Sequence, residues 1–267
     1  MIPKKIHYCW FGHSQLPAFA QKCISSWKKC CPDYDIIEWN EQNYDINQAP
    51  LYVRQAYQMK KYAYVTDYVR LQIIYENGGI YFDTDVELIK PIDNLLEYSA
   101  FFGADTTCKI ATGLGFGASA GHPLVKELMA SYENRSFFKE DGTLNASNCP
   151  YIDTFVFNRH GYYEEMRVQI LGKENNGVLI LPAEFMDPVV FKTGKLRKTS
   201  NTISIHWYTA TGLSEKNTVR FEPRKKQLRR ERRERRMDWI KTLPNKVLRM
   251  TVGNSNYERI KHYFKGK

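Results

Sequence analysis

The amino-acid sequence predicts an α/β fold in which short buried strands alternate with helices. Apolar and aromatic runs at residues 6–11 and 35–39 have the length and composition of strands, and residues 19–29 between them place apolar side chains at helical spacing. A second helical pattern covers residues 52–77, stops at two glycines and leads into another apolar run at residues 80–82. Because a strand–helix–strand unit pairs its strands in parallel through a right-handed crossover, the chain is expected to open with a parallel pair.

Further elements extend this domain toward the carboxyl terminus. Strands are expected at residues 86–89, twice within 101–116, at 178–181 and at 202–208, and a helix is expected at 122–132. After Phe221 the chain changes abruptly to a run rich in Arg and Lys. We therefore predict a catalytic domain over residues 1–221 and a basic helical appendage over residues 222–267.

Composition and cysteine usage limit the classes of protein to consider. The chain has 267 residues, of which 43% are hydrophobic, enough for a globular domain with a sizeable core. Its six cysteines form no Cys-x-x-Cys pair and no histidine cluster has zinc-finger spacing, so the sequence does not favour a structural zinc site. The first residues lack an apolar signal stretch and no apolar run is long enough to cross a membrane, which favours a cytoplasmic protein with free thiols.

The positive charge of the chain is concentrated in its last part. Residues 224–267 contain 16 of the 39 Lys and Arg but only 4 of the 29 Asp and Glu, so the remainder is close to neutral. A basic helix that carries Trp239 suits the anionic inner face of a cell membrane, and residues 224–243 are the segment expected to bind there. A solvated charged helix without a partner and nonspecific nucleic-acid binding remain as alternatives for this segment.

Two carboxylates, Asp83 and Asp85, directly follow the apolar run at residues 80–82. On extended backbone, residues two apart point to the same side, and ligands of open α/β sheets bind at the carboxyl ends of strands. Mn²⁺ and Mg²⁺ prefer oxygen ligands and complete their shell with substrate phosphates. Gly78 and Gly79 would let the backbone approach a ligand closely. The pattern predicts a metal site that holds a diphosphate.

The Asp83-Thr84-Asp85 motif also allows other interpretations. The plainest interpretation is a strand-end turn that carries two solvated acids. A phosphatase of the haloacid-dehalogenase type also uses Asp-x-Asp after a strand, but it needs Thr or Val where this chain has Glu87, and its motif lies near the start of the chain. A nucleic-acid-binding protein with a non-catalytic α/β body is a further alternative. The glycine-rich residues 111–117 match neither a dinucleotide fingerprint nor a phosphate loop, and are expected to line the acceptor side of the cleft.

The surrounding sequence resembles a known family of enzymes. The strings IHYCW at residues 6–10, YVTDYVRLQIIYENGGIYFDTDVELIKPID at residues 64–93 and SIHWY at residues 204–208 are similar to glycosyltransferase family 32. This family contains capsular-polysaccharide transferases and yeast initiating mannosyltransferases, and is related to the glucosyltransferase domains of large clostridial toxins. The resemblance covers residues 2–100 well and residues 100–210 more loosely.

The resemblance implies a GT-A fold, a Rossmann-like α/β layer, and a set of roles. It implies that Asp85 coordinates the metal and that Asp83 contacts the ribose or the donor sugar and assists the metal. His206 matches a late metal ligand, and Asp67 with Arg70 matches a pair that reaches the sugar hydroxyls and the diphosphate. The remaining donor-site positions are Trp10, which matches an aromatic near the base, and Gly78, Gly79 and Tyr81 within the same string. Asp153 is a looser match for a residue that reaches the sugar.

The residue types also allow plainer interpretations of some of these positions. Asp67 and Arg70 are three apart on a helix and can form a simple intrahelical ion pair. His206 can be a packed core histidine, and Trp10 can be a core aromatic.

As an enzyme, the chain is expected to be a retaining, metal-dependent hexosyltransferase that uses Mn²⁺ or Mg²⁺. The expected donor is a UDP-sugar, with a GDP-sugar second, carrying a hexose or an N-acetylhexosamine. The expected acceptor is a glycan or a lipid-linked oligosaccharide in surface (capsule) polysaccharide synthesis, at the cytoplasmic face of the membrane. No second carboxylate stands out as a nucleophile, so no covalent glycosyl-enzyme is predicted.

Overall fold

The computed structural model describes residues 1–145, 149–190 and 193–209. The predicted domain boundary at residue 221 and the basic appendage at 222–267 lie outside these residues. Among the described residues, no helix combines the length and the apolar character needed to cross a membrane.

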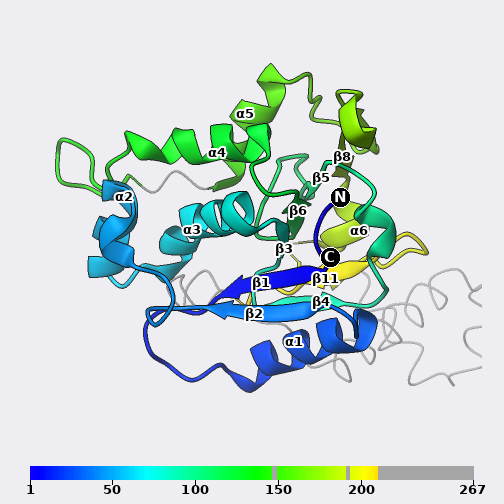
Figure 1. The fold of residues 1–267 in the computed structure, drawn as a ribbon, viewed down its shortest axis with the longest axis horizontal. Helices are drawn as coiled ribbons and strands as arrows, with labels where there is room; N and C mark the ends of the chain where they lie inside the picture. The colour runs from blue at the N-terminus through cyan, green and yellow to red at the C-terminus, as the bar shows by residue number, and fades with distance from the viewer. Residues whose placement is uncertain (146–148, 191–192, 210–267) are drawn as a thin grey trace, which may run out of the picture. The chain divides into compact units, whose positions relative to one another are not determined.

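A mixed seven-stranded sheet forms the centre of the structure (Figure 1). Its strand order is β2-β1-β3-β6-β5-β8-β7. The strand bounds are β1 Lys5–Cys9, β2 Asp35–Trp39, β3 Gly79–Tyr81, β5 Ala100–Gly103, β6 Phe116–Ala118, β7 Gln169–Leu171 and β8 Val178–Leu181. Strands β2, β1, β3, β5 and β8 share one direction, whereas β6 and β7 run opposite to their neighbours. The loops after β1, β3, β5 and β8 therefore leave the sheet at the same edge.

Two small antiparallel sheets and six α-helices complete the described fold. The small sheets pair β4 (Val86–Leu88) with β11 (Ser204–His206), and β9 (Val189–Val190) with β10 (Lys195–Leu196). The helices are α1 Ala18–Cys30, α2 Leu51–Gln58, α3 Tyr62–Asn77, α4 Pro123–Glu133, α5 Cys149–Arg159 and α6 Ala183–Met186. Through the β4–β11 pair, the end of the described chain lies beside the segment that follows Asp85.

The strand–helix–strand opening is confirmed: β1 and β2 are parallel and joined by α1. The single helix predicted over 52–77 is wrong, because α2 and α3 are separated by residues 59–61. Lys60 there has φ 54°, in the left-handed region that interrupts a helix. At its other end α3 stops at Gly78, whose φ of 62° suits glycine.

Several further elements were not expected from the pattern. Residues 101–116 hold β5 but only the first residue of β6, and most of the interval is loop. Helix α5 was missed because it contains one proline and several polar residues and buries side chains around much of its circumference, so it lacks a clear apolar stripe. Edge strand β7 is too short for an alternating pattern to identify.

The sheet separates two hydrophobic cores. Helices α2, α3, α4 and α5 cover one face, and α1 lies on the other (Figure 1). Alternate residues of β5 divide between them, since Phe102 faces the first core and Phe101 the second. In the second core Trp27 of α1 is fully buried, packs against Phe82, and donates its indole N–H to the Val86 carbonyl at 2.7 Å. Trp27 therefore ties α1 to both ends of the loop that carries Asp83 and Asp85.

We expect Trp27→Ala to lower the free energy of unfolding by about 3–5 kcal/mol, because it opens a large cavity in a closed core and removes a buried hydrogen bond. Denaturant unfolding measures this loss. Phe155→Ala, at a side chain that is mostly exposed on α5, is the control and should change stability by no more than about 0.5 kcal/mol. Equal effects of the two substitutions would contradict the assignment of Trp27 to the core.

Candidate active site

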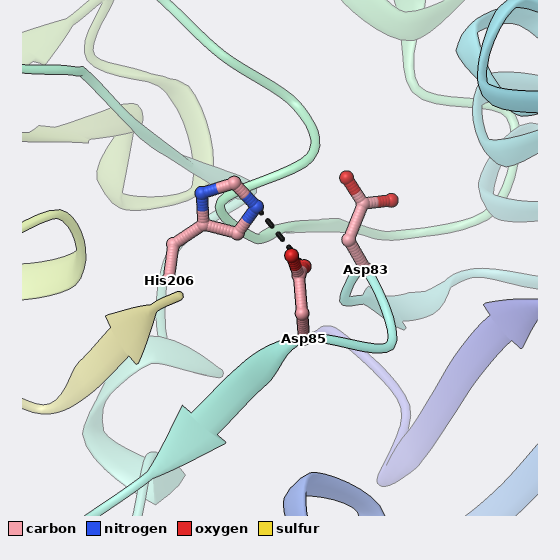
Figure 2. A group of neighbouring side chains, drawn as sticks. All are labelled: Asp83, Asp85 and His206. Atoms are coloured by element: carbon pink, nitrogen blue, oxygen red, sulfur yellow. Dashed lines mark ion pairs between the residues drawn. The ribbon is translucent and has the colours of Figure 1, made fainter. Parts of the chain in front are cut away.

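The two motif carboxylates lie in a tight turn between β3 and β4. Thr84 and Asp85 form the turn, and the Val86 N–H donates to the Asp83 carbonyl at 3.0 Å. The expectation that extended backbone aligns the two side chains is therefore wrong. The turn itself, together with the segments packed on it, brings the two carboxylates to the same side (Figure 2).

Asp85 is held from the late segment of the chain. The Asp85 carboxylate forms an ion pair with His206, whose Nε2 lies 3.1 Å from Oδ1 (Figure 2). Its second oxygen, Oδ2, accepts from the Thr209 backbone N–H at 2.8 Å and from the Thr209 hydroxyl at 3.1 Å. Antiparallel pairing places His206 opposite Val86, which explains why a residue so late in the chain reaches the turn.

Asp83 is held from three other directions. Its Oδ1 accepts from the Tyr81 hydroxyl at 3.0 Å, and its backbone N–H donates to the Gly113 carbonyl at 3.2 Å. The Arg70 guanidinium lies 3.7 Å from Oδ2 and also stands over the Tyr81 ring, 5.2 Å from its centroid. The Asp83 side chain remains 30% exposed, so it reaches solvent while these contacts fix its orientation.

Asp83, Asp85 and His206 form the metal-ligand cluster of the described residues. One ligand atom from each lies within 4.8 Å of the other two. Carboxylate oxygen and imidazole nitrogen are both ligands of divalent cations such as Mn²⁺. Among the described residues, the buried Nδ1 of His206 has no hydrogen-bond partner, so its Nε2 is the nitrogen directed at the carboxylates. The donor set therefore fits a divalent cation.

The charges of this cluster are strongly coupled. Burial opposes the charge on His206, but the ion pair with Asp85 outweighs it and raises the pKa of His206 to about 9. Burial also opposes the charge on Asp85. The ion pair with His206 and the hydrogen bonds from Thr209 outweigh burial and lower the pKa of Asp85 to about 2. The ion pair thus favours a protonated His206 beside an ionised Asp85, and a divalent cation held by the same groups would compete with the His206 proton.

Asp67 and Arg70 form an ion pair that also belongs to the site. Arg70 Nη2 lies 2.7 Å from Asp67 Oδ1, which confirms the intrahelical pair on α3. The same guanidinium reaches Asp83 through its other nitrogen, so the pair is not confined to the helix. Burial raises the pKa of Asp67 to about 7 despite Arg70, because a buried carboxylate loses hydration.

Asp153 of α5 joins the same buried region. Its Oδ2 accepts from the Thr112 hydroxyl at 2.9 Å and from the Cys149 thiol at 3.0 Å, and burial raises its pKa to about 6. Its Oδ1 has no partner among the described residues. Asp153 also acts electrostatically on Asp67, so the two acids lie in one polar cluster beneath Arg70.

The four remaining predicted donor residues have different settings: Trp10 and Tyr81 lie toward the carboxyl ends of β1 and β3, whereas Gly78 and Gly79 lie at the amino-terminal end of β3. Trp10 follows β1, is half-buried, and donates its indole N–H to the Ser14 carbonyl at 2.6 Å. Tyr81 is buried and reaches the site through Asp83. A Cβ on Gly78 would lie 2.9 Å from the Ala120 nitrogen, and one on Gly79 would lie 2.8 Å from the Lys5 carbonyl. The close approach predicted for these two glycines is therefore made to the protein's own backbone.

Sequence reasoning missed Gly113 and Thr209. A Cβ on Gly113 would overlap Asp83 Oδ2 and would lie 2.8 Å from Arg70 Nη1. Gly113 belongs to the glycine-rich residues 111–117, which were expected to form a strand edge on the acceptor side; instead the loop packs against Asp83. The glycines were the available signal, but only the position of the loop shows what they accommodate.

Comparison with known proteins gives a match over part of the chain. Residues 17–102 match the model described as glycosyltransferase sugar-binding region containing DXD motif. Over this region the chain is similar to family-32-like glycosyltransferases. Inositol phosphoceramide mannosyltransferase 3 of Schizosaccharomyces pombe is 30% identical over 142 residues, which cover 51% of this chain and 38% of that protein. Inositol phosphoceramide mannosyltransferase 1 of the same yeast is 24% identical over 172 residues, covering 60% and 52%. The matched region of the chain thus spans about 38–52% of the length of these two relatives.

Solved structures were compared as well. PaToxG Glycosyltransferase is 17% identical with a TM-score of 0.47, over 59% of this chain and 68% of that one. The expected α/β architecture of the glycosyltransferase is confirmed by its own sheet, and its DXD motif follows a central strand at the ligand-binding edge, as a GT-A fold requires.

We expect Mn²⁺ binding near neutral pH to release about one proton per ion, because His206 must lose its proton to act as a ligand. Affinity should rise with pH until the pKa of about 9 is passed. Calorimetric titration in buffers of different ionisation enthalpy measures the released proton. Mn²⁺ binding without proton release would show that His206 is not a ligand. In His206→Asn, the proton release on Mn²⁺ binding should disappear.

We expect Gly113→Ala to reduce transferase activity by roughly 10-fold or more, because the added methyl group displaces Asp83, which supports the metal site. Gly103→Ala is the matched control, because the nearest contact of its added methyl group is the flexible Met186 sulfur at 3.1 Å, and its three nearest atoms belong to Met186 and Leu114 rather than to Asp83 or Arg70. Initial rates with each variant measure the effect, and thermal unfolding checks the fold. Full activity of Gly113→Ala would show that Asp83 tolerates displacement.

Proposed function

We propose that this glycosyltransferase moves a hexose or N-acetylhexosamine from a nucleotide-sugar donor to a glycan or lipid-linked acceptor, with retention at the anomeric carbon and with a divalent cation. The observation that carries the proposal is the cluster of Asp83, Asp85 and His206, whose ligand atoms lie within 4.8 Å of one another in a DXD sugar-binding region. Mn²⁺ is the first cation to test and Mg²⁺ the second.

In this proposal, different side chains bind different parts of the donor. A cation on the cluster would neutralise charge on the diphosphate leaving group. Arg70 presents a second positive charge 3.7 Å from Asp83 and is held in place by Asp67, so it can support the same diphosphate without reorganising. Asp67, Asp83 and Asp153 offer carboxylate oxygens that accept hydrogen bonds, as sugar hydroxyls require.

In this proposal the nucleotide end of the donor binds beside Trp10. A polar cavity of about 540 Å³ lies after β2, lined by residues 41–47 with Arg54, Tyr57 and Gln58. Its Glu41 accepts from the Gly12 N–H at 2.6 Å, which joins the cavity wall to the loop that carries Trp10. A polar cavity suits a ribose, and Trp10, which does not itself line this cavity, offers an aromatic face to a base.

The donor base and sugar need a direct experiment. A UDP-sugar is our first choice and a GDP-sugar the second, and the names of the two yeast relatives make mannose the first sugar to test. The same names, which specify an inositol phosphoceramide acceptor, support a lipid-linked acceptor. Action in surface polysaccharide synthesis at the inner face of the membrane is proposed on the family resemblance alone.

We expect UDP or GDP to bind this glycosyltransferase with Mn²⁺ and to lose affinity when a chelator is added. Thermal shift or calorimetry with a panel of nucleoside diphosphates measures this and identifies the base. Asp85→Asn should lower turnover by roughly 100-fold or more, since it removes a charged metal ligand while keeping the side-chain shape. Asp35→Asn, on an exposed position of β2, is the matched control and should be unchanged. Normal turnover of Asp85→Asn would reject the metal-dependent mechanism.

A further inference from the structure

Residues 207–209, which follow β11, fold over the Asp83–Asp85 turn; we name them the arm. The arm is tied to Asp85 at both ends. The Trp207 N–H donates to the Asp85 carbonyl at 3.0 Å, and Thr209 donates its N–H and its hydroxyl to the Asp85 carboxylate. The arm therefore determines which oxygen of Asp85 is already engaged and which one faces His206.

The middle residue of the arm adopts an uncommon conformation. Tyr208 has φ 50°, in the left-handed region that aromatic residues rarely occupy. This turn is what allows Trp207 and Thr209 to contact the same aspartate from two sides. Because such a conformation persists only where the surroundings impose it, the contacts of the Tyr208 side chain are the ones to consider.

The Tyr208 side chain contacts Asp187 and His206. Its hydroxyl donates to Asp187 Oδ2 at 2.7 Å, a short hydrogen bond to a carboxylate. Its ring lies edge-to-face against the His206 imidazole, with centroids 4.2 Å apart. The ring thus covers one side of a proposed metal ligand, and the hydroxyl is anchored on Asp187.

Asp187 is built into the fold as a rigid anchor. It ends α6, its backbone N–H donates to the Ala183 carbonyl at 2.7 Å, and its side chain is fully buried. Besides Tyr208, Oδ2 accepts from the Thr106 N–H at 3.3 Å, whereas Oδ1 has no partner among the described residues. Burying a carboxylate costs free energy, and nothing in the proposed chemistry uses this one directly.

We propose that Asp187 and Tyr208 are positioning residues that preorganise the divalent-cation site of Asp83, Asp85 and His206. The inference rests on the proposed function and adds two residues that neither the DXD motif nor the sequence predicted. Asp187 anchors Tyr208, Tyr208 fixes the orientation of His206 and the turn of the arm, and the arm delivers Thr209 to Asp85 Oδ2. Asp85 Oδ1 and His206 Nε2 are then directed at the same point.

The test uses variants that keep side-chain shape. Tyr208→Phe removes only the hydroxyl, and Asp187→Asn removes only the charge. The matched controls are Tyr8→Phe and Glu38→Gln, because Tyr8 of β1 donates to Glu38 of β2 at the same 2.7 Å and neither residue is hydrogen-bonded to Asp83, Asp85 or His206 among the bonds of the described residues. Mn²⁺ binding is measured calorimetrically and by electron paramagnetic resonance on the full chain, alone and with UDP or GDP, and thermal unfolding is measured in parallel.

Tyr208→Phe should weaken Mn²⁺ binding by roughly 10-fold, the usual effect of losing a residue that orients a metal ligand. Asp187→Asn should weaken it as well, and the double variant should be no weaker than the worse single one, because both act through the same hydrogen bond. Tyr8→Phe and Glu38→Gln should keep the Mn²⁺ affinity of the unmodified chain even where they lower its melting temperature.

Unchanged Mn²⁺ affinity in Tyr208→Phe, with a lowered melting temperature, would overturn the inference and leave Tyr208 a purely structural residue. That result would not affect the proposed function, provided that the unmodified chain binds Mn²⁺. If the unmodified chain binds no Mn²⁺ under any of these conditions, the proposed function itself fails and the inference fails with it.

Discussion

The ion pair between Asp85 and His206 is the contact on which the site depends. It joins the turn after β3 to the last described strand, β11, which is far away in sequence. Both side chains are largely buried, so their attraction is stronger than that of a surface pair, and neither could remain charged there alone. A divalent cation placed between the same groups would replace the proton on His206 as the source of positive charge.

A second group of charges surrounds Arg70. Its guanidinium faces Asp67 and Asp83, and Asp153 contributes a further buried carboxylate nearby. The pKa values of Asp67 and Asp153 are raised by burial, to about 7 and about 6, so these acids take up protons far more readily than ordinary carboxylates. A region with this excess of acceptors suits a ligand that brings hydroxyl groups, such as the sugar of the proposed donor.

Much of this arrangement is visible in local sequence patterns. The strand–helix–strand opening follows from local pattern, because α1 buries one helical face and β1 is a short continuous apolar run that is buried on both faces. The Asp83-Thr84-Asp85 motif is recognisable because two carboxylates directly after a buried strand stand where open α/β sheets bind ligands. Asp67 and Arg70 are three apart on α3, and this spacing alone places them on one face of the helix.

The sequence by itself thus determined the α/β class, the motif and the family resemblance. Only the tertiary structure decided that Asp83 and Asp85 lie in a turn, that Gly113 must lack a side chain beside Asp83, and that His206 lies against Asp85 in a group that could hold a metal ion. The reason is physical, because periodicity and propensity act over neighbouring residues only. These contacts join loops that are distant in sequence. The loops meet because the sheet brings the carboxyl ends of β3 and β8 and the β4–β11 pair to one edge.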